Sequence, residues 1–308
     1  MTKLAFLFPG QASQYIGMGR DLYHEFPLAR RVYDKASDLL GFDLKKISFE
    51  GPEEELKQTK ITQPAIFVHS YVLSEILKER GIKPAVAAGH SLGEYSALVC
   101  ADALDFEEAL TLVKLRGELM QKAGEDHLGT MAAVMGLTEE VVKALCDEAS
   151  VEGVVKSANF NSPGQIVISG TLTGVHRAMA LAEESGARIV KELVVSGAFH
   201  SPLMEDARRG LGEALKQTPV GPAKIPVYAN VNARPVTGPG EIRDLLIAQL
   251  THPVRWAQSV GNMIRDGVNL FYEVGPGRVL QGLLKRIDRG VSCQTVGTAG
   301  EIANIFQE

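Results

Sequence analysis

The chain has 308 residues, of which 45% are hydrophobic and 22% are charged, so it carries enough apolar material for a sizeable core and is not predicted to be disordered. Its formal net charge of −5 argues against nucleic acid as a partner. The three cysteines are odd in number and form no CxxC pair, which argues against a disulfide framework and favours a reducing cytoplasm.

Residues 1–127 alternate short apolar segments with helical patterns. Leu4–Phe8 is predicted to be a buried strand that ends at the turn Pro9-Gly10. It is too short for a signal peptide, and no apolar run reaches the length of a membrane span, so we expect a cytoplasmic protein without membrane contact. A central strand is predicted at 86–88, and helices at 21–25, 28–40, 64–80, 92–101 and 106–123, with Pro64 near the first turn of its helix. This alternation favours a parallel α/β sheet.

Residues 128–196 have a different order of elements. Strands are predicted at 130–135, 154–159, 165–169 and 188–194, and helices at 139–148 and 175–184. The order β-α-β-β-α-β is the ferredoxin-like pattern. We therefore interpret this segment as a small subdomain inserted into a larger domain.

Residues 197–308 return to the larger domain. Helices are predicted at 203–216, 241–249, 256–265 and 279–286, strands at 227–229, 270–274 and 293–296, and a Pro/Gly-rich turn at 236–240. The predicted fold class is α/β: a parallel-sheet, α/β-hydrolase-like large domain (1–127 and 197–308) with an inserted ferredoxin-like small subdomain (128–196).

The segment Gly89-His90-Ser91-Leu92-Gly93 has the pattern G-x-S-x-G between a predicted strand and a predicted helix. A tight turn there would raise the Ser91 hydroxyl out of the sheet, with glycines where a Cβ would clash. The N–H of Leu92 would point at a developing oxyanion. The sequence thus predicts a nucleophilic serine.

A nucleophilic serine needs a base, and His200 is the candidate among seven histidines. Ser201 and Pro202 are suited to begin a helix, and that helix N-terminus would disfavour the imidazolium form of His200. Its position fits a capping-region histidine without chemistry equally well. Either a carboxylate or a backbone carbonyl could orient it. His90 is expected to have a structural or substrate-contact role.

Several segments together resemble the malonyl-CoA:acyl carrier protein transacylases of fatty-acid synthesis and the acyltransferase domains of polyketide synthases. The resemblance spans nearly the whole chain and is specific in the order and spacing of its motifs. These motifs are Phe8-Pro9-Gly10-Gln11-Ala12-Ser13-Gln14, Gln63-Pro64, Gly89-His90-Ser91-Leu92-Gly93-Glu94-Tyr95, Arg116, Asn159, Gly197-Ala198-Phe199-His200-Ser201 and Glu273-Val274-Gly275-Pro276-Gly277.

The resemblance implies catalytic roles. Ser91 is similar to the acylated nucleophile and His200 to its base. The backbone N–H groups of Gln11 and Leu92 are similar to the oxyanion hole, and Gln249 matches the residue whose main-chain carbonyl holds the histidine.

The resemblance also implies substrate contacts. Arg116 is similar to the clamp for the malonyl carboxylate, because a guanidinium pairs with a carboxylate through two hydrogen bonds; an isolated arginine would otherwise be taken for a helix-surface charge. Gln63 and Asn159 are similar to residues that line the acyl and pantetheine site. In similar domains, a phenylalanine at the position of Phe199 accompanies the use of malonyl rather than methylmalonyl. Ala12 departs from the family glycine, with little expected effect.

The expected reaction is transfer of malonyl from malonyl-CoA to acyl carrier protein by a monomer, without cofactor or metal. The sequence contains no H-E-x-x-H, P-loop or GxGxxG motif. A serine hydrolase or thioesterase, a non-catalytic carrier-binding protein, and the same transferase in polyketide synthesis stay as alternatives. Lys191, Arg208 and Arg209 could meet an acidic carrier.

Overall fold

The computed structural model describes residues 2–306, and its centre is a parallel sheet of the order β10-β9-β1-β2-β7-β8. Only the pair β7–β8 is antiparallel within this sheet. The strands are β1 (Leu4–Phe8), β2 (Val86–Gly89), β7 (Val227–Tyr228), β8 (Pro235–Val236), β9 (Leu270–Val274) and β10 (Ser292–Val296). Phe8 at the end of β1 pairs with Gly89 at the end of β2, so the loops that follow these two strands are neighbours.

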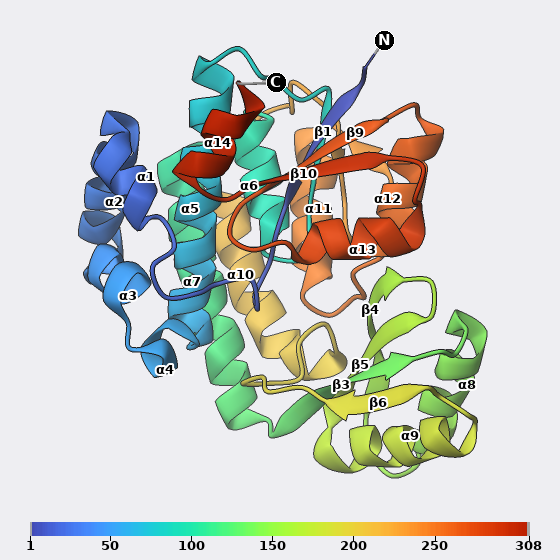
Figure 1. The fold of residues 1–308 in the computed structure, drawn as a ribbon. Helices are drawn as coiled ribbons and strands as arrows, with labels where there is room; N and C mark the ends of the chain where they lie inside the picture. Colours follow the sequence, from blue (N-terminus) through green and yellow to red (C-terminus); the bar gives the residue numbers. More distant parts are fainter. Residues whose placement is uncertain (1, 307–308) are drawn as a thin grey trace.

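Both faces of the sheet are covered by helices, which explains why its central strands β1 and β2 are continuously apolar. Phe6 and Phe8 of β1 pack into one core, and Ala5 and Leu7 pack into the other. One face carries α1 (Arg20–Glu25), α2 (Pro27–Leu40), α3 (Leu44–Glu50), α4 (Glu53–Leu56), α5 (Thr59–Glu79), α6 (Gly93–Cys100), α7 (Phe106–Asp126), η1 (Pro202–Met204), α10 (Glu205–Gln217), α11 (Pro239–Gln249) and α14 (Ala299–Ile305). The opposite face carries α12 (Trp256–Arg265) and α13 (Val279–Ile287), as Figure 1 shows.

A second sheet lies beside the first, at the lower right of Figure 1. Its order is β4-β5-β3-β6 and all its pairs are antiparallel. It consists of β3 (Gly129–Met135), β4 (Val155–Ser162), β5 (Gln165–Thr171) and β6 (Ile189–Glu192), with α8 (Glu139–Ala149) and α9 (Leu172–Glu184) packed together over its own apolar core. The predicted α/β class with a parallel sheet and a separate small sheet is confirmed. The boundaries at 128 and 196 stay a prediction.

Some elements differ from the prediction. Helix α5 begins at Thr59, so Pro64 lies inside it and not near its first turn. The short helices α3, α4 and α14 and the strand β8 were not predicted. In α3, Leu44, Ile47 and Phe49 pack on the large core, so tertiary contacts rather than local propensity stabilise it.

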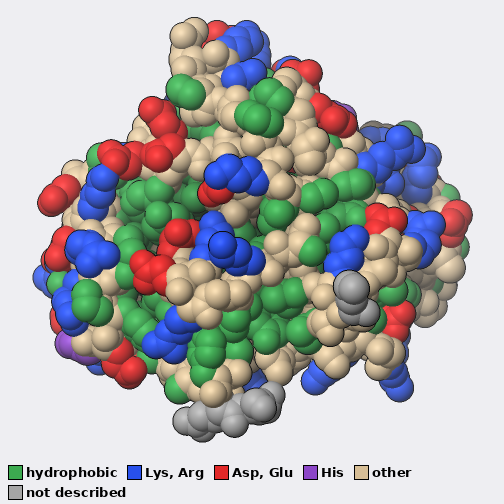
Figure 2. Space-filling view, turned by 90° about the horizontal axis from the view of Figure 1, so that it is seen from above, with side chains coloured by type: hydrophobic (Ala, Val, Ile, Leu, Met, Phe, Trp, Pro, Cys, Tyr) green, Lys and Arg blue, Asp and Glu red, His purple; other side chains and the backbone are tan. Residues whose placement is uncertain are grey.

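The surface matches the mixed composition of the chain. Seen from above, on the side away from the small sheet, acidic and basic side chains alternate around apolar ones (Figure 2). Within residues 2–306, no helix combines the length and apolarity that crossing a bilayer requires.

Candidate active site

Ser91 stands on a tight turn between β2 and α6 that only glycine neighbours allow. Its φ of 50° lies in the left-handed region. A Cβ on Gly89 would lie 1.8 Å from the carbonyl carbon of Gly93, and a Cβ on Gly93 would lie 2.1 Å from the oxygen of Phe8. Both glycines of the G-x-S-x-G pattern are therefore required by close backbone approach, as the sequence predicted.

His200 lies against the Ser91 hydroxyl. The Nε2 atom of His200 is 2.8 Å from Ser91 Oγ, and its Nδ1 is 2.9 Å from the backbone oxygen of Gln249. A carbonyl oxygen can only accept, so Nδ1 carries the proton and Nε2 is free to accept the proton of Ser91. The backbone carbonyl takes the place of an orienting acid.

The pKa of His200 is lowered to about 3, which keeps the imidazole neutral. Burial is the main cause and the positive charge of Arg116 is the second; the hydrogen bond to the Gln249 carbonyl acts in the opposite direction. Ser201 does cap the following turn, with its Oγ 3.2 Å from the N of Leu203. The contribution of the helix end to a neutral histidine stays a prediction.

Arg116 projects from the middle of α7 into the same site and is only 1% exposed. Its Nη1 donates to Gln63 Oε1 at 2.7 Å. Its Nη2 donates to Gln249 Oε1 at 2.8 Å and to Ser91 Oγ at 3.0 Å. All these acceptors are neutral, and within residues 2–306 the Nε has no hydrogen-bond partner. A buried cation with neutral acceptors, in contact with the Ser91 hydroxyl, favours an anionic ligand.

Two backbone donors lie next to the turn. Among the residues that the structure describes, the N–H groups of Gln11 and Leu92 donate to no protein acceptor. Leu92 directly follows Ser91, and the Gln11 loop passes the turn so closely that a Cβ on Gly10 would lie 2.5 Å from the oxygen of His90. These two N–H groups are therefore free to donate to a ligand bound beside Ser91.

Ala12 in the same loop has a φ of 80°. This left-handed backbone, rather than lack of space for a methyl group, explains why glycine suits the position. An alanine there costs about 1 kcal/mol.

The remaining predicted site residues, His90, Asn159 and Phe199, lie in different surroundings. His90 is half-buried beside Trp256, with a ring distance of 5.5 Å, and its Nε2 lies 2.9 Å from Asn161 Oδ1 of the small sheet. Asn159 lies two residues earlier on β4, buried, where its backbone pairs with Val254. Phe199 is buried directly before His200 and packs into the large core.

Sequence reasoning missed Asn230 and Glu94 as site residues. Asn230 Oδ1 accepts the N–H of Ser91 at 2.7 Å, and its Nδ2 donates to the oxygen of Gly89 at 2.7 Å. Glu94 Oε2 accepts from the backbone N of Asn230 at 3.0 Å and from Gln249 Nε2 at 2.8 Å. Asn230 follows β7 at the carboxyl edge of the parallel sheet, where ligands commonly bind. Its position directly after a predicted strand is therefore the feature of the sequence that could have identified it as a site residue.

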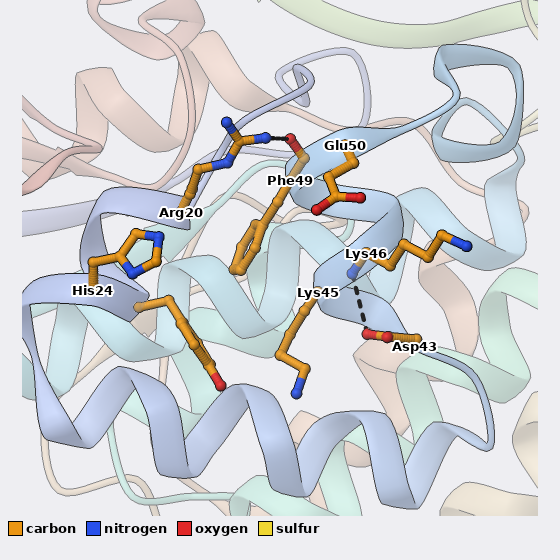
Figure 3. Close-up of a pocket in the computed structure, with 8 residues that line it drawn as sticks. Arg20, His24, Asp43, Lys45, Lys46, Phe49 and Glu50 are labelled. Atoms are coloured by element: carbon orange, nitrogen blue, oxygen red, sulfur yellow. Dashed lines mark hydrogen bonds between the residues drawn. The ribbon is translucent and has the colours of Figure 1, made fainter.

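Other places that could hold a ligand are weaker candidates. The hollow in Figure 3, of about 390 Å³, lies between α1 and α3 and contains none of the residues around Ser91 described above. Its Arg20 is bonded to the oxygen of Phe49 and its Lys45 to Asp34, so these two cations already have partners. Within residues 2–306, no group of three or more His, Cys, Asp or Glu side chains is arranged to hold a metal.

Comparison with known proteins identifies the family of the chain. Residues 5–301 match the family model described as the acyl transferase domain. The chain is 48% identical over 290 residues to a malonyl CoA-acyl carrier protein transacylase of Bacillus subtilis, covering 94% of this chain and 92% of the relative. It is 44% identical over 288 residues to the protein of that name from Escherichia coli K12, covering 93% of each.

Solved structures agree as well. An acyl carrier protein S-malonyltransferase from Vibrio cholerae has a TM-score of 0.96 at 42% identity, covering 99% of this chain and all 100% of that one. A malonyl-transacylase in complex with a type II polyketide-synthase acyl-carrier protein has a TM-score of 0.96 at 40% identity, with 99% of each chain covered. The chain therefore belongs to the acyl transferase family.

Proposed function

We propose that this protein transfers a malonyl group from malonyl-CoA to the phosphopantetheine thiol of acyl carrier protein, through a malonyl ester of Ser91. The observation that carries the proposal is the buried Arg116, whose guanidinium lies 3.0 Å from Ser91 Oγ and has only neutral partners. A free carboxylate on the acyl group would give this cation a direct charged hydrogen-bond partner, which it lacks at present. The names of the relatives at 48% and 44% identity support the same substrate.

The first half-reaction acylates the serine. His200 Nε2 takes the proton of Ser91 as Oγ attacks the thioester carbonyl carbon. The resulting oxyanion is stabilised by the N–H groups of Gln11 and Leu92. Collapse of the tetrahedral intermediate breaks the carbon–sulfur bond, and the departing CoA sulfur receives the proton from His200.

The second half-reaction repeats these steps with a different thiol. The phosphopantetheine thiol of the carrier gives its proton to His200 and attacks the ester carbonyl of malonyl-Ser91. The intermediate then releases Ser91 Oγ, which takes the proton back. Ser91 supplies the nucleophile and CoA supplies the activated acyl group, so the proposal includes neither a bound cofactor nor a metal.

Arg116 would give selectivity for a carboxylated acyl group. Its Nη groups can form a two-pronged pair with the malonyl carboxylate. Acetyl-CoA would leave the cation unpaired, and polar sites of this kind discriminate by roughly 10⁴-fold. Phe199, Gln63, His90 and Asn159 would contribute to the acyl and pantetheine contacts, with Phe199 disfavouring an extra methyl.

The proposal also extends to the carrier and its pathway. We place the protein in the cytoplasm, as a monomer, supplying fatty-acid elongation. The similar structure in complex with a polyketide carrier supports the same chemistry in polyketide synthesis as the second candidate. Arg208 and Arg209 are paired with Glu205 and Asp206, which leaves Lys191 as the better candidate for carrier contact.

The test is intact-mass measurement after mixing the protein with malonyl-CoA and no carrier. The wild type should gain one malonyl group and release one CoA, and holo-carrier should then remove the group. Ser91→Ala should gain nothing, whereas the control Ser48→Ala, a buried serine on α3, should behave like the wild type. Continuous CoA release without an adduct would instead indicate a hydrolase. The absence of both an adduct and CoA release would refute the catalytic proposal.

A further inference from the structure

The carboxyl group of Glu94 is a titratable group in the site that the mechanism above does not use. It lies in the first turn of α6 and is 3% exposed. Its two hydrogen bonds come from neutral donors, the backbone N of Asn230 at 3.0 Å and Gln249 Nε2 at 2.8 Å. Both donors contact the same oxygen, Oε2. A buried carboxyl group is costly, so its presence beside the nucleophile calls for a reason.

Gln249 shows what the carboxylate does. Its Nε2 donates to Glu94 and to the oxygen of Ser91 at 3.1 Å, and its Oε1 accepts from Arg116 Nη2 at 2.8 Å. If this amide were turned over, its oxygen would face two acceptors and its NH₂ would face the guanidinium donors. An ionised carboxylate can only accept, so Glu94 permits one of the two orientations.

Two parts of the proposed machinery depend on Gln249. Its side-chain oxygen holds Arg116, and its backbone oxygen holds His200 at 2.9 Å. Glu94 also binds the backbone of Asn230, whose side chain holds the N–H of Ser91 at 2.7 Å. One carboxylate is therefore connected, through two residues, to the clamp, the base and the nucleophile.

We infer that Glu94 is a positioning residue whose carboxylate fixes the orientation of the Gln249 amide and thereby aligns Arg116 for the carboxylate of the acyl group. This inference rests on the proposed function. It assigns Glu94 an effect on the choice of acyl group, not only on folding. Burial raises the pKa of Glu94 to about 7, while Gln249, Asn230 and the charge of Arg116 oppose that rise and favour the ionised acceptor form.

The test compares rates of Ser91 loading in single turnovers with malonyl-CoA and with acetyl-CoA. Glu94→Ala and Glu94→Met should lower malonyl loading by about 10–100-fold, because misplacing a binding group by an ångström has this scale of effect. Acetyl loading does not use Arg116 and should fall much less, so the malonyl/acetyl ratio falls. Glu94→Gln keeps an oxygen for both donors and should retain most of the ratio.

Glu273 is the matched control. It is also buried, and its oxygens accept from the backbone N atoms of Leu280 and Gln281 at 2.9 and 2.7 Å, at the end of β9. Glu273→Gln should change stability without changing the malonyl/acetyl ratio. Glu94→Met fills nearly the same space as glutamate, so it keeps the test decisive if Glu94→Ala does not fold.

An unchanged ratio in Glu94→Met, with both loading rates lowered together, would overturn the inference and leave Glu94 a role in holding Ser91 and His200 or in folding, without an effect on the choice of acyl group. A lowered malonyl/acetyl ratio in Glu94→Met, together with a ratio close to that of the wild type in Glu94→Gln, would support the inference. Failure of the wild type itself to load malonyl would be a different result, because it would refute the proposed function before any variant is considered.

Discussion

The molecule contains two buried histidines in similar settings, His200 beside Ser91 and His69 within α5. Each has one ring nitrogen at a backbone carbonyl: His200 Nδ1 is 2.9 Å from the oxygen of Gln249, and His69 Nε2 is 3.0 Å from that of Gly297. Burial lowers the pKa of both, to about 3 for His200 and about 4 for His69. Burial and a backbone anchor therefore produce a neutral imidazole in either place.

The difference lies at the second ring nitrogen. His200 Nε2 contacts the hydroxyl of Ser91, which also touches Arg116 and lies near unused backbone donors. His69 Nδ1 lies 3.3 Å from the hydroxyl of Tyr33, and this site is closed: a Cβ on Gly19 would lie 2.0 Å from that hydroxyl. Burial raises the pKa of Tyr33, so this phenol stays protonated. A neutral base becomes useful only where its partner is nucleophilic and the site can admit an acyl group.

The strongest test of this difference between the two histidines is to replace each of them in turn. His200→Ala should lower the rate of malonyl transfer by at least about 10³-fold, because it removes the proton acceptor of Ser91. His69→Gln should change that rate by less than about twofold, since it lies outside the site. The measurement is CoA release in the presence of holo-carrier, with folding checked by circular dichroism. A large loss of rate in folded His69→Gln would contradict the distinction drawn here.

Removing Arg116 would make the surroundings of His200 more like those of His69. Arg116→Ala should lower malonyl loading by about 10²–10³-fold, the scale of a lost buried charge pair. Acetyl loading should be retained or increase. Competition between malonyl-CoA and acetyl-CoA, read by intact mass, measures both. Arg116→Lys is the control, since it keeps the charge but loses the two-pronged geometry; full malonyl selectivity in Arg116→Ala would remove the clamp from the proposal.

His69 should act on stability instead. Its pKa is lowered to about 4 in the folded protein from an ordinary 6.5, so the unfolded chain binds the extra proton between these values. Its contribution is present above pH 6.5 and is lost as the pH falls toward 4. Between pH 7 and pH 5 the wild type should lose about 2 kcal/mol more unfolding free energy than His69→Gln. Urea unfolding at both pH values tests this; equal losses would show that His69 is not the acid-sensitive group.

The smallest expected effect concerns the loop beside the site. Ala12→Gly should raise the free energy of unfolding by less than about 1 kcal/mol, because relief of the left-handed backbone is partly offset by the entropy of the unfolded chain. Ala233→Gly, with a φ of 57° outside the site, is the matched control. Both variants should keep the wild-type transfer rate. A rate change confined to Ala12→Gly would show that backbone conformation in this loop tunes the Gln11 donor.

Local features of the site could be predicted from the sequence. The turn at Ser91 requires glycine at 89 and 93 because of contacts within a few residues and with the neighbouring strand. The apolar strands β1 and β2, and the cap that Ser201 makes after His200, are likewise local. The alternation of elements was sufficient for the fold class, since a parallel sheet needs helical connections and has apolar strands.

The sequence by itself therefore determined the class of fold and the tight turn at Ser91, and it predicted the nucleophile and, through resemblance, the residues opposite the serine. Only the tertiary structure decided how they are held. The Gln249 carbonyl reaches His200 across 49 positions, and Asn230 reaches Ser91 across 139. The position of Pro64 within α5 and the stability of α3 also depend on packing. Hydrogen bonds between distant segments leave no periodic pattern in the chain, so amide orientations such as that of Gln249, and the burial that keeps His200 neutral, are properties of the folded molecule.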